Sequence, residues 1–137
     1  MTLSIKQFFL LLIVVFAIAL FLVKRISKED IAKFYGITRP TLQNWVTFFP
    51  YGTSLSDWKK RRKFTSFEKG MMSSTWGTDI KLVLNKTQIA QKACSDLKTL
   101  RENVLINLDK IGITEDAWNR CSIFPPIITQ RILNMFC

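Results

Sequence analysis

Two groups of side chains in this chain stand out for the hydrogen bonds and ion pairs that they can form. The first group comprises Thr38, Arg39, Thr41, Gln43 and Asn44. An arginine can donate two hydrogen bonds to the edge of guanine, and a carboxamide can both donate to and accept from adenine. The second group is the unbroken cationic run Lys59, Lys60, Arg61, Arg62 and Lys63. Cations in such a run bind phosphates without reading sequence, so the two groups together predict a nucleic-acid interface.

Residues and motifs that would indicate catalysis or metal binding are scarce in this chain. The chain contains no histidine, which excludes histidine general bases, Ser-His-Asp triads and histidine-ligated metals within one chain. Its three cysteines, Cys94, Cys121 and Cys137, form no CxxC pair and are odd in number. They are typical of small core residues in a reducing compartment. With no glycine-rich phosphate loop and no recognisable pair of acids, we expect neither an enzyme nor a bound cofactor.

The charge distribution favours an anionic partner. The net charge is +10 at pH 7 over 137 residues. Residues 24–70 carry 11 basic and 4 acidic groups, or +7 of that total. A basic excess of this kind is typical of proteins that bind nucleic acid or the anionic face of a membrane.

The first polar group must be positioned by residues 28–46. Ile31, Ala32 and Tyr35 can share one face of a first helix, because residues three and four apart are neighbours on a helix. Gly36 permits a sharp turn, since it has no Cβ to clash at positive φ. Ile37 is predicted to fill the gap between this helix and the next.

A second helix is predicted to follow directly. The side chain of Thr38 can accept a hydrogen bond from a backbone N–H and so cap the helix. Pro40 falls in the first turn, where its missing N–H costs little. Leu42 and Trp45 point back toward the first helix, which leaves the polar group on the exposed face.

This arrangement resembles the helix-turn-helix of bacterial and phage DNA-binding proteins, such as small regulators, resolvases and terminase small subunits. In that family a small residue packs where the helices cross, a glycine follows four residues later, and an aliphatic residue and two further apolar positions come next. The matching residues are Ala32, Gly36, Ile37, Leu42 and Trp45. The resemblance is confined to residues 28–46, and it implies that the second helix contacts base edges. The alternative is an ordinary helical hairpin that touches no nucleic acid.

The N-terminus carries a run from Phe8 to Val23 that contains no polar residue. We expect a single membrane span over residues 5–25. Cations that follow the run, Lys24, Arg25, Lys28 and Lys33, place the C-terminal region in the cytoplasm by the positive-inside rule. The alternatives are a cleaved signal peptide and a buried or partner-binding helix, the last of which fits a cytoplasmic protein.

The C-terminal region, residues 79–137, is predicted to be helical, and residues 70–78 are predicted to be a boundary loop. Apolar residues recur at helical spacing from Thr87 to Ile111, which predicts one long helix: Ile89, Ala93, Leu97, Leu100, Val104, Leu108 and Ile111. Its broad apolar face can serve as core or as the pairing surface of a homodimer or larger assembly. The triplet at residues 112–114 repeats Gly36-Ile37-Thr38, which indicates either a second helix-turn-helix or a coincidence.

These observations predict an all-α fold with three parts. Residues 1–25 form a hydrophobic, membrane-spanning helix, residues 26–69 form the helix-turn-helix with the basic segment, and residues 79–137 form the C-terminal helical region. The expected function is that of a membrane-tethered protein that binds duplex DNA, for example a regulator. The alternative is a membrane-anchored assembly subunit that uses the same surfaces for protein or anionic lipid.

Overall fold

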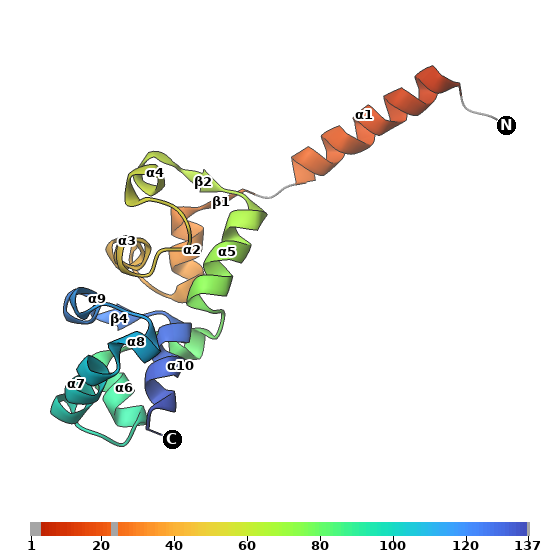
Figure 1. Cartoon of the computed structure of the whole chain (residues 1–137). Helices are drawn as coiled ribbons and strands as arrows, with labels where there is room; N and C mark the ends of the chain where they lie inside the picture. The colour runs from red at the N-terminus through yellow and green to blue at the C-terminus, as the bar shows by residue number, and fades with distance from the viewer. Residues whose placement is uncertain (1–3, 23–24, 137) are drawn as a thin grey trace.

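The computed structural model describes residues 4–22 and 25–136. The N-terminal helix α1 (Ile5–Leu22) is followed by two units of similar construction (Figure 1). The first unit contains β1 (Ile26–Ser27), α2 (Lys28–Tyr35), α3 (Arg39–Phe48), α4 (Leu55–Lys60), β2 (Lys63–Phe64) and α5 (Ser66–Trp76). A short 3₁₀ turn, η1 (Ile80–Leu82), leads into the second unit.

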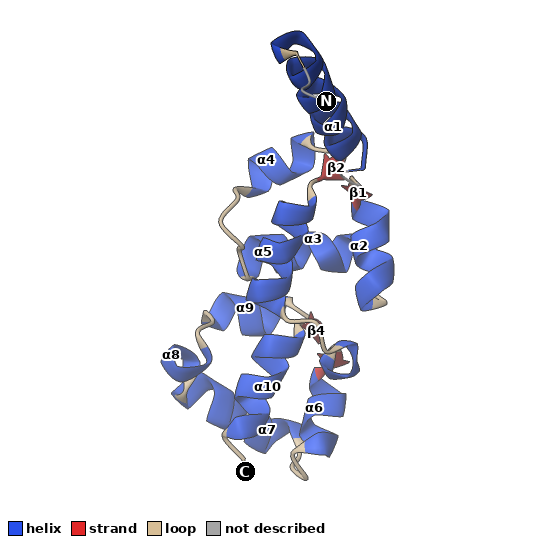
Figure 2. Cartoon of the chain, turned by 90° about the vertical axis from the view of Figure 1, so that its right-hand side faces the viewer, coloured by secondary structure: helices blue, strands red, loops and turns tan. Residues whose placement is uncertain are grey.

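The second unit repeats the order of the first. It contains β3 (Leu84–Asn85), α6 (Lys86–Lys92), α7 (Leu97–Ile106), α8 (Leu108–Ile111), α9 (Glu115–Arg120), β4 (Ile123–Phe124) and α10 (Pro126–Asn134). In each unit the strand before the helices pairs antiparallel with the strand before the last helix, β1 with β2 and β3 with β4. Only α8 lacks a counterpart among the helices described for the first unit. Residues 26–76 and 84–134 therefore form an internal structural duplication, with the second unit lying beyond α5 on the side away from α1 (Figure 2).

The helical pairs α2–α3 and α6–α7 are built alike. Both first helices begin with a capping box, at Ser27 and at Asn85. Gly36 adopts φ 68° after α2, and Cys94 adopts φ 53° after α6. The backbone N–H after each of these residues bonds to the carbonyl of Ala32 or Ala90 at 2.9 Å. The turn predicted at Gly36 is therefore present in the structure. In the second unit Cys94 makes the same turn although it is not glycine.

A layered contact of cation and two aromatic rings also occurs in both units. Trp58 stacks on Phe64 with ring centroids 4.6 Å apart, and Trp118 stacks on Phe124 at 5.2 Å. The ammonium of Lys28 lies 5.1 Å from the centre of the Trp58 ring. The ammonium of Lys86 lies 4.7 Å from that of Trp118. This contact fixes the start of α2 to α4 and the start of α6 to α9.

The two units share one core. Trp45 and Trp76 are fully buried, with ring centroids 5.6 Å apart. The indole N–H of Trp45 donates to the carbonyl of Ile123 at 2.9 Å, which joins α3 to the edge of β4. Gly77 adopts φ 91° between the units, and a Cβ there would lie 3.0 Å from Ile127 Cγ1. The units are thus joined by buried contacts at positions where only particular side chains fit.

The predicted membrane span and the purely α-helical fold are both wrong. Among the described residues, no helix is both long enough and apolar enough to cross a membrane. The helix α1 has 18 residues, so at roughly 1.5 Å per residue it is shorter than a hydrocarbon core of roughly 30 Å. Its side chains at residues 5–16 are exposed, so the buried-helix alternative also fails for that part. The mostly helical fold contains the two small sheets as well.

The single long helix predicted over residues 87–111 is also wrong, because the segment forms α6, α7 and α8. The chain turns at Cys94, and the carboxylate of Asp96 caps α7 by accepting from the N–H of Thr99 at 2.6 Å. The apolar residues keep their helical spacing in the sequence across this turn, although the helix itself is interrupted there. Ile89, Leu100, Val104 and Ile111 of the stripe are buried in the chain's own core, whereas Leu97 is exposed. The apolar residues therefore do not form one continuous helical face, and pairing of chains through this segment stays a prediction.

Two smaller expectations also change. Residues 70–76 belong to α5 rather than to a loop, since a capping box of Thr65 and Glu68 starts that helix and Met72 and Trp76 are buried. The triplet at 112–114 does not correspond to residues 36–38. By its place before α9 it corresponds to residues 52–54 before α4.

The two described cysteines differ in their exposure to solvent. Cys121 is buried, and this burial raises the pKa of its thiol to about 11 against the opposing effect of Lys86. Cys94 is exposed and is not a core residue. Cys137 lies outside the described residues.

Candidate nucleic-acid interface

The exposed face of α3 carries most of the first polar group. Arg39, Gln43 and Asn44 are exposed, and Thr41 is half-buried. Thr38 is exposed as well, but its hydroxyl caps α3 by accepting from the N–H of Thr41 at 3.4 Å. The two threonine hydroxyls also lie 3.0 Å apart and bond to each other. The structure therefore leaves Arg39, Gln43 and Asn44 available, and it gives Thr38 and Thr41 a role in holding the helix.

A hollow of about 520 Å³ lies between the start of α3 and α4. Its lining comprises Lys28, Arg39, Pro40, Leu42, Gln43, Asn44 and Trp58. Pro40 has no N–H and stands at the first turn of α3, so the backbone there needs no partner from solvent. The exposed polar residues of α3 therefore border a concave surface that Lys28 and Trp58 of other helices also line.

A second hollow of about 470 Å³ adjoins the first. It is lined by Ser27, Lys28, Glu29, Arg39, Lys59, Arg61, Arg62 and Lys63. Lys28 and Arg39 belong to both hollows, so the α3 face and the cationic run form one continuous surface. We call this the basic face: Lys28, Arg39, Gln43, Asn44, Lys59, Arg62 and Lys63.

The positive charges of the basic face act on one another. Partial burial and then the charge of Arg39 lower the pKa of Lys28. Arg39 forms an ion pair with Glu29 at 3.7 Å, and both side chains are largely exposed. Exposed pairs of this kind contribute about 0–1 kcal/mol. Replacing Glu29 by another anion as the partner of Arg39 would therefore cost little stability. The added negative charge would also reduce the repulsion between Arg39 and Lys28.

Arg61 is a member of the cationic run that serves the fold. Its guanidinium forms a two-pronged ion pair with the carboxylate of Glu68 and lies 5.1 Å from the centre of the Phe64 ring. Glu68 also accepts the backbone N–H of Thr65 as part of the α5 capping box. Partial burial acts to raise the pKa of Glu68, but hydrogen bonds from Arg61 and Thr65 outweigh it and the pKa is lowered. Lys60 lines neither hollow, so the run contributes three of its five cations to the basic face.

Lys28 is the residue of this surface that the sequence did not reveal as part of the site. Its place is fixed by the cation–ring contact with Trp58, which lies in a different helix. The only signal in the sequence was the recurrence of a lysine directly after each capping residue, at Lys28 and Lys86. The two lysines occupy equivalent positions in the two units.

Duplication provides an internal comparison for the basic face. The second unit has Leu97, Arg101 and Glu102 at the places of Arg39, Gln43 and Asn44. Where the first unit has the cationic run, the second has residues 119–123, which include one cation, Arg120. The same fold therefore forms without the basic face, so these charges are not required by the architecture.

Comparison with known proteins gives no further assignment: the chain matches no family model and has no significant match to a curated protein or a solved structure.

Proposed function

We propose that the first unit binds duplex DNA through the basic face. The observation that supports this most strongly is the continuity of the two hollows, which share Lys28 and Arg39. Residue types able to read bases and residue types able to bind phosphates thereby lie on one surface. The helical pair that carries this surface is the part that resembles the helix-turn-helix of bacterial and phage DNA-binding proteins.

In the proposed complex α3 enters the major groove with its N-terminal residues toward the bases. Arg39 leaves Glu29 and donates to guanine, while Gln43 or Asn44 bonds to adenine. Lys59, Arg62 and Lys63 bind phosphates on the flank of the groove and set the orientation. Thr38 and Thr41 keep the start of α3 capped, and Arg61 keeps β2 attached to α5.

The proposal includes neither a membrane span nor a dimer formed through residues 87–111. It can be tested with the full chain and a random pool of duplex DNA, from which bound sequences are selected. Replacing Lys59, Arg62 and Lys63 by glutamine should weaken binding to all sequences and reduce the salt dependence, because each lost phosphate contact lowers the slope by about 0.9. The matched control replaces Lys92, Lys98 and Lys110, three exposed cations of the second unit, by glutamine.

Arg39→Ala provides the second arm of the test. It should reduce the discrimination between selected and random DNA by about 1–3 kcal/mol, the value of one bidentate base contact. The salt slope should change by less than in the triple glutamine variant. Equal loss on selected and random DNA would assign Arg39 to phosphate binding and contradict the base-reading role of α3.

One observation favours a second candidate function, an assembly subunit whose basic face contacts anionic lipid. Phe67 lies in the first turn of α5, three residues after β2, and is 77% exposed. An exposed aromatic ring near cations can enter a headgroup region. Vesicles with and without phosphatidylserine separate the two functions. Binding to the anionic vesicles that is lost in Phe67→Ser, together with no DNA binding at low salt, would support the lipid function instead.

A further inference from the structure

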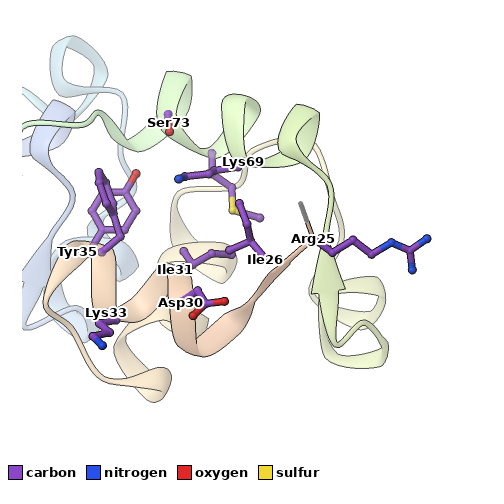
Figure 3. A pocket seen from close by; sticks show the side chains of 10 residues that line it. Arg25, Ile26, Asp30, Ile31, Lys33, Tyr35, Lys69 and Ser73 are labelled. Carbon is purple, nitrogen blue, oxygen red and sulfur yellow. The ribbon is translucent and has the colours of Figure 1, made fainter. Parts of the chain in front are cut away.

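A third hollow, of about 420 Å³, lies between α2 and α5 and shares no lining residue with the two hollows of the basic face (Figure 3). Its volume falls within the range of small-molecule sites, roughly 300–1,000 Å³. The floor is apolar, since Ile31, Tyr35 and Met72 are buried there. Ile26 and Phe34 extend the apolar lining, and Phe34 is 42% exposed although it is a large apolar side chain.

Cations stand at the edge of this hollow. Lys33, Lys69 and Arg25 line it and are exposed. The Lys69 ammonium lies 5.3 Å from the centre of the Phe34 ring, so this cation stands beside the apolar lining. The one acid in the lining, Asp30, accepts the backbone N–H of Ser27 in the α2 capping box. The local charge therefore favours an anion.

The corresponding place in the second unit carries different residues. Thr129 and Ala93 stand there in place of Lys69 and Tyr35. In the second unit α10 contacts α6, and Thr129 has no exposed surface. The lining of the hollow is therefore particular to the first unit and is not set by the fold.

We propose that this hollow binds a small amphipathic organic anion, with an apolar or aromatic body against Ile31 and Met72 and a carboxylate at Lys69. The body replaces water on an apolar floor, which is favourable in proportion to the area covered. The carboxylate forms a charge-assisted bond with an ammonium that already stands at the edge. The site is separate from the basic face, and its occupation does not depend on DNA binding.

The test uses the full chain without DNA and 2-naphthoate as the probe, with neutral 2-naphthamide as its matched partner. Binding is followed by the ¹³C-methyl resonance of Met72, assigned by Met72→Leu, because that methyl group reports on the floor of this hollow and not on exposed α1. We expect saturable shifts and an affinity for naphthoate about tenfold above that for naphthamide, which corresponds to one charge-assisted hydrogen bond.

Two variants locate the site. Lys69→Glu should weaken naphthoate binding at least about tenfold and leave naphthamide nearly unchanged, while the control Lys98→Glu, an exposed lysine of α7, should change neither. Ser73→Leu introduces the residue that the second unit has at this place and should weaken both probes by filling the hollow. Equal affinity for the two probes, or naphthoate binding that survives both variants, would overturn the proposal.

Discussion

At the scale of single residues, Thr129 places a hydroxyl where the structure offers it no partner. The side chain has no exposed surface, and among the described residues its oxygen has no hydrogen-bond partner. A buried unsatisfied polar group costs about 1–3 kcal/mol. Thr129→Val keeps the shape of the side chain and removes the hydroxyl. We expect the variant to be more stable by about 1 kcal/mol, measured as a higher urea midpoint with an unchanged slope. A lower midpoint would show that the hydroxyl is satisfied in solution.

Glu68 gives the stability a specific pH dependence. Its pKa is lower in the folded chain than the ordinary value of 4.5, so the folded state favours the ionised carboxylate. This stabilisation is fully present above the unfolded pKa and is lost as pH falls through the folded pKa. The urea midpoint of the natural chain should therefore fall more between pH 6 and pH 3 than that of Glu68→Gln. Other carboxylates titrate in both proteins and cancel in the difference. Parallel pH profiles would contradict the role given to the Arg61–Glu68 pair.

At the scale of elements, the turns after α2 and α6 allow a matched pair of substitutions. Gly36 has positive φ and no neighbouring atom within 4 Å of an added Cβ, so Gly36→Ala should cost about 1 kcal/mol through backbone conformation alone. Cys94 has a similar φ without being glycine, so Cys94→Gly should stabilise by a comparable amount. Thermal unfolding of the two variants measures both effects. A shift of the same sign in both would contradict the equivalence of the two turns.

Sequence signals predicted the helix ends that depend on near neighbours. Thr38, Gly36 and Pro40 act within a few residues of their place in the chain, and each has the predicted role. The prediction of one helix over residues 87–111 is wrong because the apolar spacing continues across the turn, so periodicity alone does not reveal it. Asp96, a typical N-cap residue, was the local sign of a new helix. The position of Lys28 over Trp58 depends on the folded contact between α2 and α4, which no local pattern contains.

At the scale of the whole molecule, the sequence did not predict the duplication because the two units share few residue types. The main ones are the Ile-Ala pair, at residues 31–32 and 89–90, and the stacked tryptophan and phenylalanine. The spacing between those two signals also differs between the units, since α8 stands only in the second. Gly112-Ile113-Thr114 then resembled the wrong segment of the first unit. The membrane span was predicted from the unbroken apolar run and the cations that flank it. Among the described residues, however, no helix is both long and apolar enough to cross a membrane.

The joint between the units can be tested at Gly77. A Cβ there would lie 3.0–3.2 Å from atoms of Pro126 and Ile127, including a backbone nitrogen, and φ is 91°. Gly77→Ala should therefore destabilise the whole chain by more than Gly36→Ala, where there is free space. Hydrogen exchange should show lost protection in both α5 and α10. Lost protection confined to α5 would indicate that the units fold independently.

The central claim is that the first unit binds DNA through the basic face. The most direct measurement is the affinity of the full chain for duplex DNA over a series of salt concentrations, for the natural chain, the Lys59/Arg62/Lys63 glutamine variant and the Lys92/Lys98/Lys110 control. We predict a steep fall of affinity with salt for the natural chain and the control, and a slope reduced by about 2.7 in the first variant, from about 0.9 for each phosphate contact. No measurable affinity at low salt, or equal slopes in the two variants, would contradict the claim.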